Sequence, residues 1–536
     1  MTLKACVTIL IATTIVLSTA APRGEAQTLP DAAARCEALP NTDFSGIPDA
    51  PTEVWTGKWV PAHERMRAYC AVTGSVAPTV GFMLLLPADH WNGKFLQYGC
   101  GGFCGPTYNG RVLFDDARSA KLDAFTRGYA LLRFDGGHSG DLGSALWAYQ
   151  NLPAQFDFGI RAPHVAALAG KAITKHFYQA DLSRSYFLGC STGGGQALSE
   201  AQRFPWDFDG IISGAPSPTF SGPMMNYLWA GKALAGKFTR ADLKLVHDRA
   251  LEACDMDDGV KDGVIGDPQH CPFDPAKLLC KAGESARCLT ADQVAAVRKV
   301  YSGPTTSKGE RIYTGGPFPG SELNWMSPTD DADDAYVNAS GAISTLAHKF
   351  FSLVGFMPAP GPNWKIADFD FDRDYRRLRL AESLFGAADN PDLRKFKATG
   401  GKLLLYQGAQ DQSDIPADAI DYYETAEKTM GGRAATQDFF RFFVIPGMNH
   451  CGGGDGAFAV DYLSYLEAWI EKGQAPDRLL SAHIRLDDPM DAYVPRFPLD
   501  PSRVAFTRPV YPYPLRAKYL GRGDPKDAAN FGPIEP

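Results

Sequence analysis

The sequence lacks an excess of positive charge and, after its first 26 residues, any long hydrophobic run. Its 53 Lys and Arg residues are outnumbered by 61 Asp and Glu residues, which gives a formal net charge of −8. This balance argues against nucleic acid or an anionic membrane as a partner. Internal repeats are also absent. A composition of 45% hydrophobic and 21% charged residues argues against a disordered chain.

The N-terminal exception has the pattern of a secretory signal peptide. A positively charged residue precedes an apolar run from Cys6 to Leu17, and small residues follow it. The run is too short to span a bilayer. We therefore expect residues 1–26 to be removed and the mature chain to begin at Gln27, secreted or periplasmic. Cleavage after Ala20 is the alternative.

Cys-x-x-Cys pairs are missing as well, although the chain has 11 cysteines. Structural zinc sites usually contain such pairs, so a zinc site between Cys254 and Cys288 is the weaker interpretation. Loss of Cys6 with the signal peptide would leave ten cysteines, an even number. In a chain bound for an oxidising compartment, this favours disulfides.

What the sequence does contain is an alternation of apolar runs with helix-compatible stretches, which predicts an α/β fold. The pattern extends from about Val80 to Pro218 and resumes between about Gly400 and Gly473. Segments rich in Gly, Pro and Asp interrupt it. We interpret this interruption as an inserted lid above the carboxyl ends of the strands, where open α/β sheets bind ligands. The predicted parts are a first core part (27–217), a lid (218–389) and a second core part (390–536).

The most informative stretch is Gly189-Cys190-Ser191-Thr192-Gly193. It follows the strand-like run 186–188 and leads into a helix-compatible stretch that begins near Gly195. A nucleophilic serine needs a tight strand-to-helix turn, with small residues two before and two after it. The motif also arises by chance in Gly-rich turns, but here the required strand precedes it and the required helix follows it. We identify Ser191 as the candidate nucleophile.

A nucleophilic serine on such a turn is expected to be followed by an acid and then by a histidine, each on a loop after a strand. Residues 402–406 are typical of a buried strand, and Asp411 follows them. Asp414 is the runner-up. His450 follows the next predicted strand and is the candidate base. His138 is its rival, but it precedes the nucleophile in the chain.

A cysteine precedes Ser191 and another follows His450. If the triad forms, Cys190 and Cys451 come close together. At this point the sequence resembles the tannase and feruloyl esterase family, whose hallmark is Cys-Ser, then Asp, then His-Cys. The resemblance runs from about residue 36 to the C-terminus and is weakest between 300 and 390. It implies an α/β-hydrolase fold with a large inserted lid, and a serine esterase acting on galloyl, feruloyl or related aromatic esters.

The resemblance also supports a set of disulfides that spacing suggests but cannot fix. The expected pairs are Cys190 with Cys451, Cys36 with Cys70, Cys100 with Cys104, Cys254 with Cys271, and Cys280 with Cys288.

Ester hydrolysis by a serine needs two N–H donors for the oxyanion. One should be the amide of Thr192, directly after the nucleophile. The Gly-rich stretch 99–105 suits the other, because glycines let the backbone approach a ligand closely, and the resemblance gives Gly102. A phosphate-binding loop is the weaker interpretation, since no Gly-Lys-Ser/Thr ending follows.

An acidic stretch with interspersed glycines, residues 254–264, offers the hard oxygen ligands that suit Ca²⁺. No glutamate closes an EF-hand loop, and a solvated acidic turn is the alternative. The resemblance implies a structural calcium ion in the lid. Its ligands would be the side chains of Asp255, Asp258 and Asp262 and the main-chain carbonyls of Val260 and Val264.

The chemistry requires no organic cofactor, and the expected partner is a small aromatic ester; the oligomeric state stays open. Four lid aromatics are candidates for stacking on the ring: Tyr227, Trp229, Trp325 and Phe350. The alternatives on the same triad are a general carboxylesterase, a terephthalate monoester hydrolase and an acyltransferase. A non-catalytic binding protein on this scaffold is the third interpretation, against which the complete triad argues.

Overall fold

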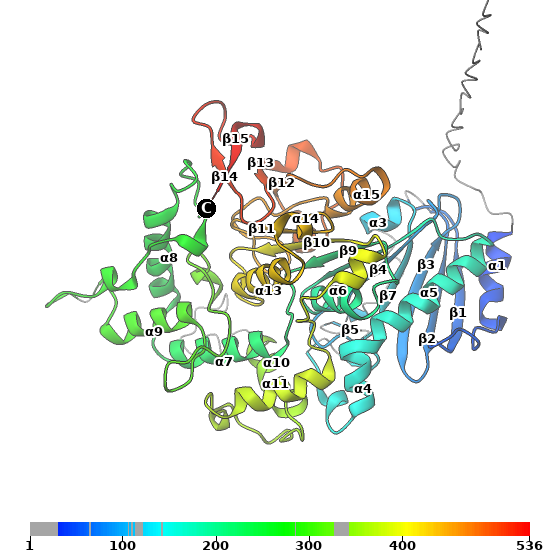
Figure 1. Cartoon of the computed structure of the whole chain (residues 1–536), viewed down its shortest axis with the longest axis horizontal. Coiled ribbons are helices and arrows are strands. Elements are labelled where there is room, and N and C mark those ends of the chain that lie inside the picture. The colour runs from blue at the N-terminus through cyan, green and yellow to red at the C-terminus, as the bar shows by residue number, and fades with distance from the viewer. Residues whose placement is uncertain are drawn as a thin grey trace, which may run out of the picture.

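The computed structural model describes residues 31–535 except 64–65, 106, 109–110, 113–121, 141–142, 285 and 326–341. The predicted signal peptide lies outside the described residues. The centre of the structure is a nine-stranded mixed sheet (Figure 1). Its order is β1 (Thr52–Val60), β2 (Tyr69–Val76), β3 (Val80–Pro87), β7 (Ala130–Phe134), β4 (Lys94–Tyr98), β8 (Arg184–Cys190), β9 (Gly210–Gly214), β10 (Lys402–Gly408) and β11 (Phe440–Ile445).

The six strands from β7 to β11 in this order run parallel, whereas β1, β2 and β3 pair in antiparallel fashion at one edge. Helices cover both faces, so the inner strands are continuous apolar runs rather than alternating ones. Along β10, for example, Leu403 and Leu405 belong to one core and Leu404 and Tyr406 to the other. The predicted α/β class is confirmed.

One face of the sheet carries α5 (Ala162–Tyr178), α6 (Thr192–Arg203) and α13 (Pro416–Thr429), whose apolar residues belong to the first core. The other face carries α3 (Asp123–Thr126) and α15 (Tyr462–Lys472), which belong to the second. Four shorter helices are α1 (Ala32–Ala38), α4 (Leu152–Phe156), α12 (Arg394–Ala398) and α14 (Arg433–Gln437), of which α1 and α12 contribute residues to the first core. In the described part of the chain, none of the helices is long and apolar enough to cross a bilayer.

The chain leaves the sheet after β9 and returns at β10, and the helices between them gather to one side of the sheet in Figure 1. These helices share a hydrophobic core of their own, which includes Leu243, Val297 and Phe351. The same core takes in Phe103 and Phe158 from the first core part, so the insertion is anchored on loops of the sheet domain. The boundaries 218 and 389 remain predictions. The helices are α7 (Ser221–Leu234), α8 (Arg240–Cys254), α9 (Ala291–Ser302), α10 (Ala342–Lys349) and α11 (Asp374–Phe385).

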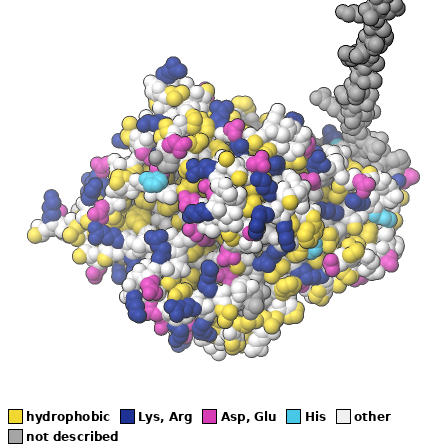
Figure 2. Space-filling view, viewed as in Figure 1, with side chains coloured by type: hydrophobic (Ala, Val, Ile, Leu, Met, Phe, Trp, Pro, Cys, Tyr) yellow, Lys and Arg dark blue, Asp and Glu magenta, His cyan; other side chains and the backbone are white. Residues whose placement is uncertain are grey.

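After α15 the chain forms two antiparallel pairs, β12 (Leu479–Ile484) with β13 (Val504–Val510) and β14 (Arg516–Tyr519) with β15 (Phe531–Ile534). A further short pair joins β5 (Thr107–Tyr108) to β6 (Arg111–Val112). On the face drawn in Figure 2, basic and acidic side chains are interspersed rather than segregated. This agrees with the charge balance of the sequence.

Five disulfides join the ten cysteines, in the pairings that the resemblance implies: Cys36–Cys70, Cys100–Cys104, Cys190–Cys451, Cys254–Cys271 and Cys280–Cys288. The zinc interpretation of the lid cysteines is therefore dropped.

Candidate active site

Ser191 lies on a sharp turn between β8 and α6, with φ 62° and ψ −128°. This φ is uncommon for a residue other than glycine, and such strain is typical of a nucleophile elbow. The turn is possible because strand and helix nearly touch. A Cβ atom at Gly189 would lie 2.1 Å from the carbonyl oxygen of Gly193. The Ser191 amide donates to the carbonyl of Gly214 at 3.0 Å, which fixes the turn against β9.

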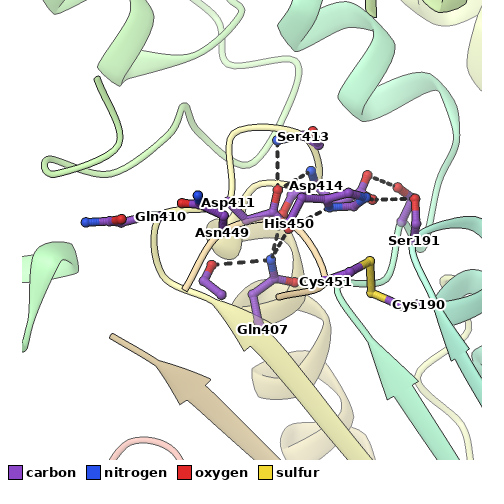
Figure 3. Close-up of polar contacts among 12 residues, drawn as sticks. Cys190, Ser191, Gln407, Gln410, Asp411, Ser413, Asp414, Asn449, His450 and Cys451 are labelled. Atoms are coloured by element: carbon purple, nitrogen blue, oxygen red, sulfur yellow. Dashed lines mark hydrogen bonds and ion pairs between the residues drawn. A yellow bond between two sulfur atoms is a disulfide. The ribbon is translucent and has the colours of Figure 1, made fainter. Parts of the chain in front are cut away.

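Asp411 follows β10 and is fully buried. Its Oδ2 accepts a hydrogen bond from Nδ1 of His450 at 2.9 Å (Figure 3). Gln407 donates to the same oxygen at 3.0 Å, and the backbone amides of Ser413 and Asp414 donate to Oδ1 at 2.8 and 3.0 Å. Because four donors hold this carboxylate, the imidazole is fixed through Nδ1 and its Nε2 is left for chemistry.

Asp414 lies on the Nε2 side of the imidazole. Its Oδ2 is 3.8 Å from Nε2 of His450 and 3.5 Å from Oγ of Ser191, which donates to it. Its Oδ1 accepts from the hydroxyl of Ser217. Asp411 is therefore the carboxylate that orients the histidine. Asp414, the runner-up in the sequence, is a second buried carboxylate around which the serine and the histidine both gather (Figure 3).

The neighbouring charges of His450, Asp411 and Asp414 shift the pKa values of His450 and Asp414. Burial opposes protonation of His450, but its attraction to Asp411, the hydrogen bond to that residue and the nearby Asp414 raise its pKa to about 9. Burial raises the pKa of Asp414 to about 6, and the attraction of His450 opposes that shift. Near pH 7 the two groups thus form an imidazolium–carboxylate pair.

The Cys190–Cys451 disulfide joins the residue before Ser191 to the residue after His450 (Figure 3). The two Cα atoms are 5.9 Å apart, and the cysteines are separated by 261 positions in the chain. The elbow and the histidine loop are therefore linked covalently as well as by packing.

The Gly-rich loop after β4 lies directly against the elbow. A Cβ atom at Gly99 would be 2.7 Å from the Cα of Gly193. The hydroxyl of Thr192 donates to the carbonyl of Gly102 at 2.7 Å, so the two residues expected to supply oxyanion donors are hydrogen-bonded neighbours. Thr192 is also the first residue of α6, where amides lack acceptors within the helix and the helix dipole favours negative charge.

His138, the rival base, lies in a different environment. Its Nε2 is 2.7 Å from the carbonyl oxygen of Phe103, and its ring stacks on Trp147 with 3.7 Å between centroids. Burial lowers the pKa of His138 to about 4, so it is neutral near pH 7. His138 therefore contacts the Gly-rich loop through Phe103, a role that the sequence pattern did not suggest.

Beside the elbow is a cavity of about 710 Å³, part of which is open to solvent. Thr192 and Ser217 line it next to Ser191, and three phenylalanines form its apolar walls: Phe158, Phe220 and Phe350. Of the four lid aromatics considered from the sequence, Phe350 alone lines this cavity. The others, Tyr227, Trp229 and Trp325, are buried in the lid, where they pack against its interior.

The acidic stretch forms a tight loop. Asp255 is buried and accepts hydrogen bonds from the amides of Asp262 and Gly263, and Asp258 accepts from the amide of Val260. Burial and the neighbouring carboxylates raise the pKa of Asp258 to about 7. Asp262 pairs with Arg508 at 2.5 Å. An all-oxygen donor set in which carboxylates crowd one another fits a hard divalent cation.

The acidic loop also contacts residues outside the lid. Val264 shares a small cavity with Ile445 and Pro446, at the start of the loop that carries His450. A Cβ atom at Gly447 would lie 2.9 Å from a methyl group of Val264. The acidic loop therefore packs against the histidine loop.

Comparisons with known proteins agree with this architecture. A family model described as "Tannase and feruloyl esterase" matches residues 64–534. The chain is 33% identical to an uncharacterized esterase of Xanthomonas campestris pv. campestris, over 96% of this chain and 94% of that protein. It is 31% identical to the mono(2-hydroxyethyl) terephthalate hydrolase of Piscinibacter sakaiensis, over 94% and 92%. The crystal structure of feruloyl esterase B from Aspergillus oryzae superposes with a TM-score of 0.77 at 28% identity, covering 93% of this chain and all of that one.

Proposed function

Because the chain belongs to the tannase and feruloyl esterase family, we propose that its Ser191, His450 and Asp411 act together as the catalytic triad of a carboxylic ester hydrolase. The observation that carries this assignment is the imidazole of His450. Its Nδ1 is held by Asp411 at 2.9 Å. Its Nε2 and the hydroxyl of Ser191 both face Oδ2 of Asp414.

In this mechanism Oγ of Ser191 attacks the ester carbonyl carbon while Nε2 of His450 takes the hydroxyl proton. The amides of Thr192 and Gly102 stabilise the oxyanion. Collapse of the intermediate breaks the carbon–oxygen bond to the alcohol, which leaves with the proton from His450. Water then hydrolyses the acyl-enzyme by the same steps, with Asp411 holding the imidazole throughout.

The acyl part of the substrate is proposed to be aromatic, because three phenylalanines wall the cavity beside the elbow. A terephthalate monoester is the second candidate, and the similarity to the hydrolase from Piscinibacter sakaiensis favours it. Methyl gallate, methyl ferulate and mono(2-hydroxyethyl) terephthalate, assayed side by side for kcat/KM, separate the candidates.

Ser191→Ala tests the mechanism itself. We expect at least a thousandfold loss of turnover on the best ester with an unchanged melting temperature, since the hydroxyl performs chemistry and not packing. Activity within tenfold of the wild type would mean that another residue is the nucleophile.

A structural Ca²⁺ ion is also proposed for the acidic loop, with Asp255, Asp258 and Asp262 as side-chain ligands and the carbonyls of Val260 and Val264 completing the set. The crowded carboxylates and the raised pKa of Asp258 support it. Secretion or periplasmic export is proposed from the N-terminal pattern, and the five disulfides suit an oxidising compartment.

A further inference from the structure

The loop after β7, residues 135–140, lies against the Gly-rich loop that follows β4. The two strands are parallel neighbours in the sheet, so both loops leave the same edge side by side. The amide of Gly105 donates to the carbonyl of Asp135 at 2.7 Å. A Cβ atom at Gly105 would lie 2.4 Å from the carbonyl oxygen of Gly140, so the backbones also touch there. The loop after β7 is therefore in a position to fix the shape of the Gly-rich loop.

The part of the Gly-rich loop that matters for the oxyanion is a tight turn from Gly101 to Cys104. The amide of Cys104 donates to the carbonyl of Gly101 at 2.8 Å, and the hydroxyl of Thr192 donates to the carbonyl of Gly102 at 2.7 Å. Cys104 has φ 53°, which is uncommon for a residue other than glycine. Such a conformation persists only where its surroundings fix it.

His138 binds the remaining carbonyl of this turn. Its Nε2 is 2.7 Å from the carbonyl oxygen of Phe103, and because a carbonyl can only accept, Nε2 carries the hydrogen. Both residues are buried, so water does not readily replace a donor lost here. The imidazole stacks on Trp147 with 3.7 Å between centroids and 12° between the ring planes, which fixes the direction of its N–H.

The environment of His138 suits a constant donor rather than a base. Burial lowers the pKa of His138 to about 4, so the imidazole stays neutral over the range in which His450 titrates. Its hydrogen bond to Phe103 is therefore present throughout that range.

We propose that His138 is a positioning residue for the oxyanion hole: by holding the carbonyl of Phe103, it keeps the turn in the conformation that directs the amide of Gly102 toward the oxyanion. This inference rests on the proposed function, which assigns the oxyanion to the amides of Gly102 and Thr192. Loss of the Nε2 donor should therefore weaken stabilisation of the transition state and not binding of the substrate.

Two substitutions separate the donor from the ring. His138→Phe keeps a ring that can stack on Trp147 but has no donor, whereas His138→Gln keeps an N–H donor and loses the ring. We expect His138→Phe to lower kcat by at least about tenfold with KM within a few-fold of the wild type, since an oxyanion donor that is lost outright costs about 10²–10³-fold. His138→Gln should recover most of this loss.

A thionoester, in which sulfur replaces the carbonyl oxygen, shows whether the oxyanion hole is affected. Sulfur is a weak acceptor, so a thionoester gains little from the N–H donors. The substrate is the best of the three esters named above, assayed beside its thionoester. We expect the wild type to prefer the oxygen ester in kcat/KM by at least about tenfold, because its oxyanion receives both donors. In His138→Phe this preference should fall toward one, whereas displacement of the triad would slow both esters alike.

His348→Phe is the matched control. His348 also lies beside a backbone carbonyl through Nε2, that of Trp364 at 2.8 Å, but it lies in the lid on α10. Its substitution should leave kcat and the oxygen-ester preference unchanged. Melting temperatures should be measured on all variants. If His138→Phe does not fold, His138→Met, whose flexible side chain also lacks a donor, takes its place with the same expected result.

An unchanged preference and a kcat within a few-fold of the wild type in His138→Phe would overturn the inference. So would a His138→Gln variant that is no better than His138→Phe, or a wild-type preference near one. Ser191→Ala distinguishes this failure from failure of the proposed function. If it hydrolyses neither ester, the proposed function stands in every one of these cases; if it still hydrolyses them, the proposed function itself fails.

Discussion

At the scale of single residues, Asp414 changes what the histidine can do. A general base must be neutral to accept a proton, yet His450 lies between two carboxylates and its pKa is raised to about 9. Proton removal from His450 is therefore expected to limit the reaction at neutral pH. Because the neutral form increases as the pH rises through 9, activity should rise over the same range.

Asp414→Asn tests this. Removing one of the two anions should lower the pKa of His450, so the midpoint of the ascending limb of kcat/KM against pH should move down by roughly one unit or more. Asp418→Asn is the control. Asp418 is also a buried carboxylate, but it bonds to Tyr313 and not to the histidine. Identical midpoints in the wild type and Asp414→Asn would show that Asp414 does not influence the base.

The sequence was sufficient to predict that Ser191, Asp411 and His450 lie close together, because each follows a strand and their order along the chain is characteristic. It was not sufficient to tell what Asp414 does. Asp411 and Asp414 are three residues apart on one loop, and their roles depend on the backbone, which turns the amides of Ser413 and Asp414 toward the Asp411 carboxylate. Nor does spacing reveal which lid aromatic reaches the cavity, since this depends on lid packing.

At the scale of structural elements, the Cys190–Cys451 disulfide holds the elbow and the histidine loop in register. We expect Cys190→Ala with Cys451→Ala to lower turnover about a hundredfold even well below its melting temperature, because a displacement of about 1 Å can cost that much. Each single variant should resemble the double one, since each already breaks the bond. Turnover and thermal unfolding should be measured on the same samples.

Removal of Cys280–Cys288 is the matched control. That bond closes a separation of only 8 positions within the lid, and its loss should leave turnover within a few-fold of the wild type. Unchanged turnover in the Cys190/Cys451 double variant would mean that packing alone positions the histidine.

Elements were predicted unevenly. The buried strands of the central sheet are continuous apolar runs, and β3, β4 and β7 to β11 lie where the pattern indicated. The edge strand β1 and its neighbour β2 were not predicted as strands; β1 is half exposed and has no such run. In the lid, α8 and α9 begin with capping boxes at Thr239 and Thr290, a local signal that was present in the sequence but not recognised.

At the scale of the whole molecule, the acidic loop connects three parts of the chain. Asp262 and Asp267 form ion pairs with Arg508 and Arg516 of the C-terminal strands, and Val264 packs against the histidine loop. A calcium ion here would stabilise the docking of the lid, the C-terminal strands and the catalytic loop together.

Chelation with EDTA should therefore lower both the melting temperature and turnover, and added Ca²⁺ should restore both. Asp258→Asn should weaken the response to Ca²⁺. Asp274→Asn, which removes an exposed lid carboxylate paired with Arg298, should not. If EDTA shifts neither quantity and elemental analysis finds no calcium, the acidic loop is a solvated turn.

The order of the cysteines has a consequence for how the protein is made. Four of the five disulfides join cysteines that are consecutive in the chain, so each pair can close as it emerges during synthesis. Cys190 instead has no native partner until four other cysteines and then Cys451 have been translated, so it can pair wrongly in the meantime. The native bond next to the nucleophile is thus the last of the five to become possible. Recombinant production accordingly calls for a compartment that contains a disulfide isomerase.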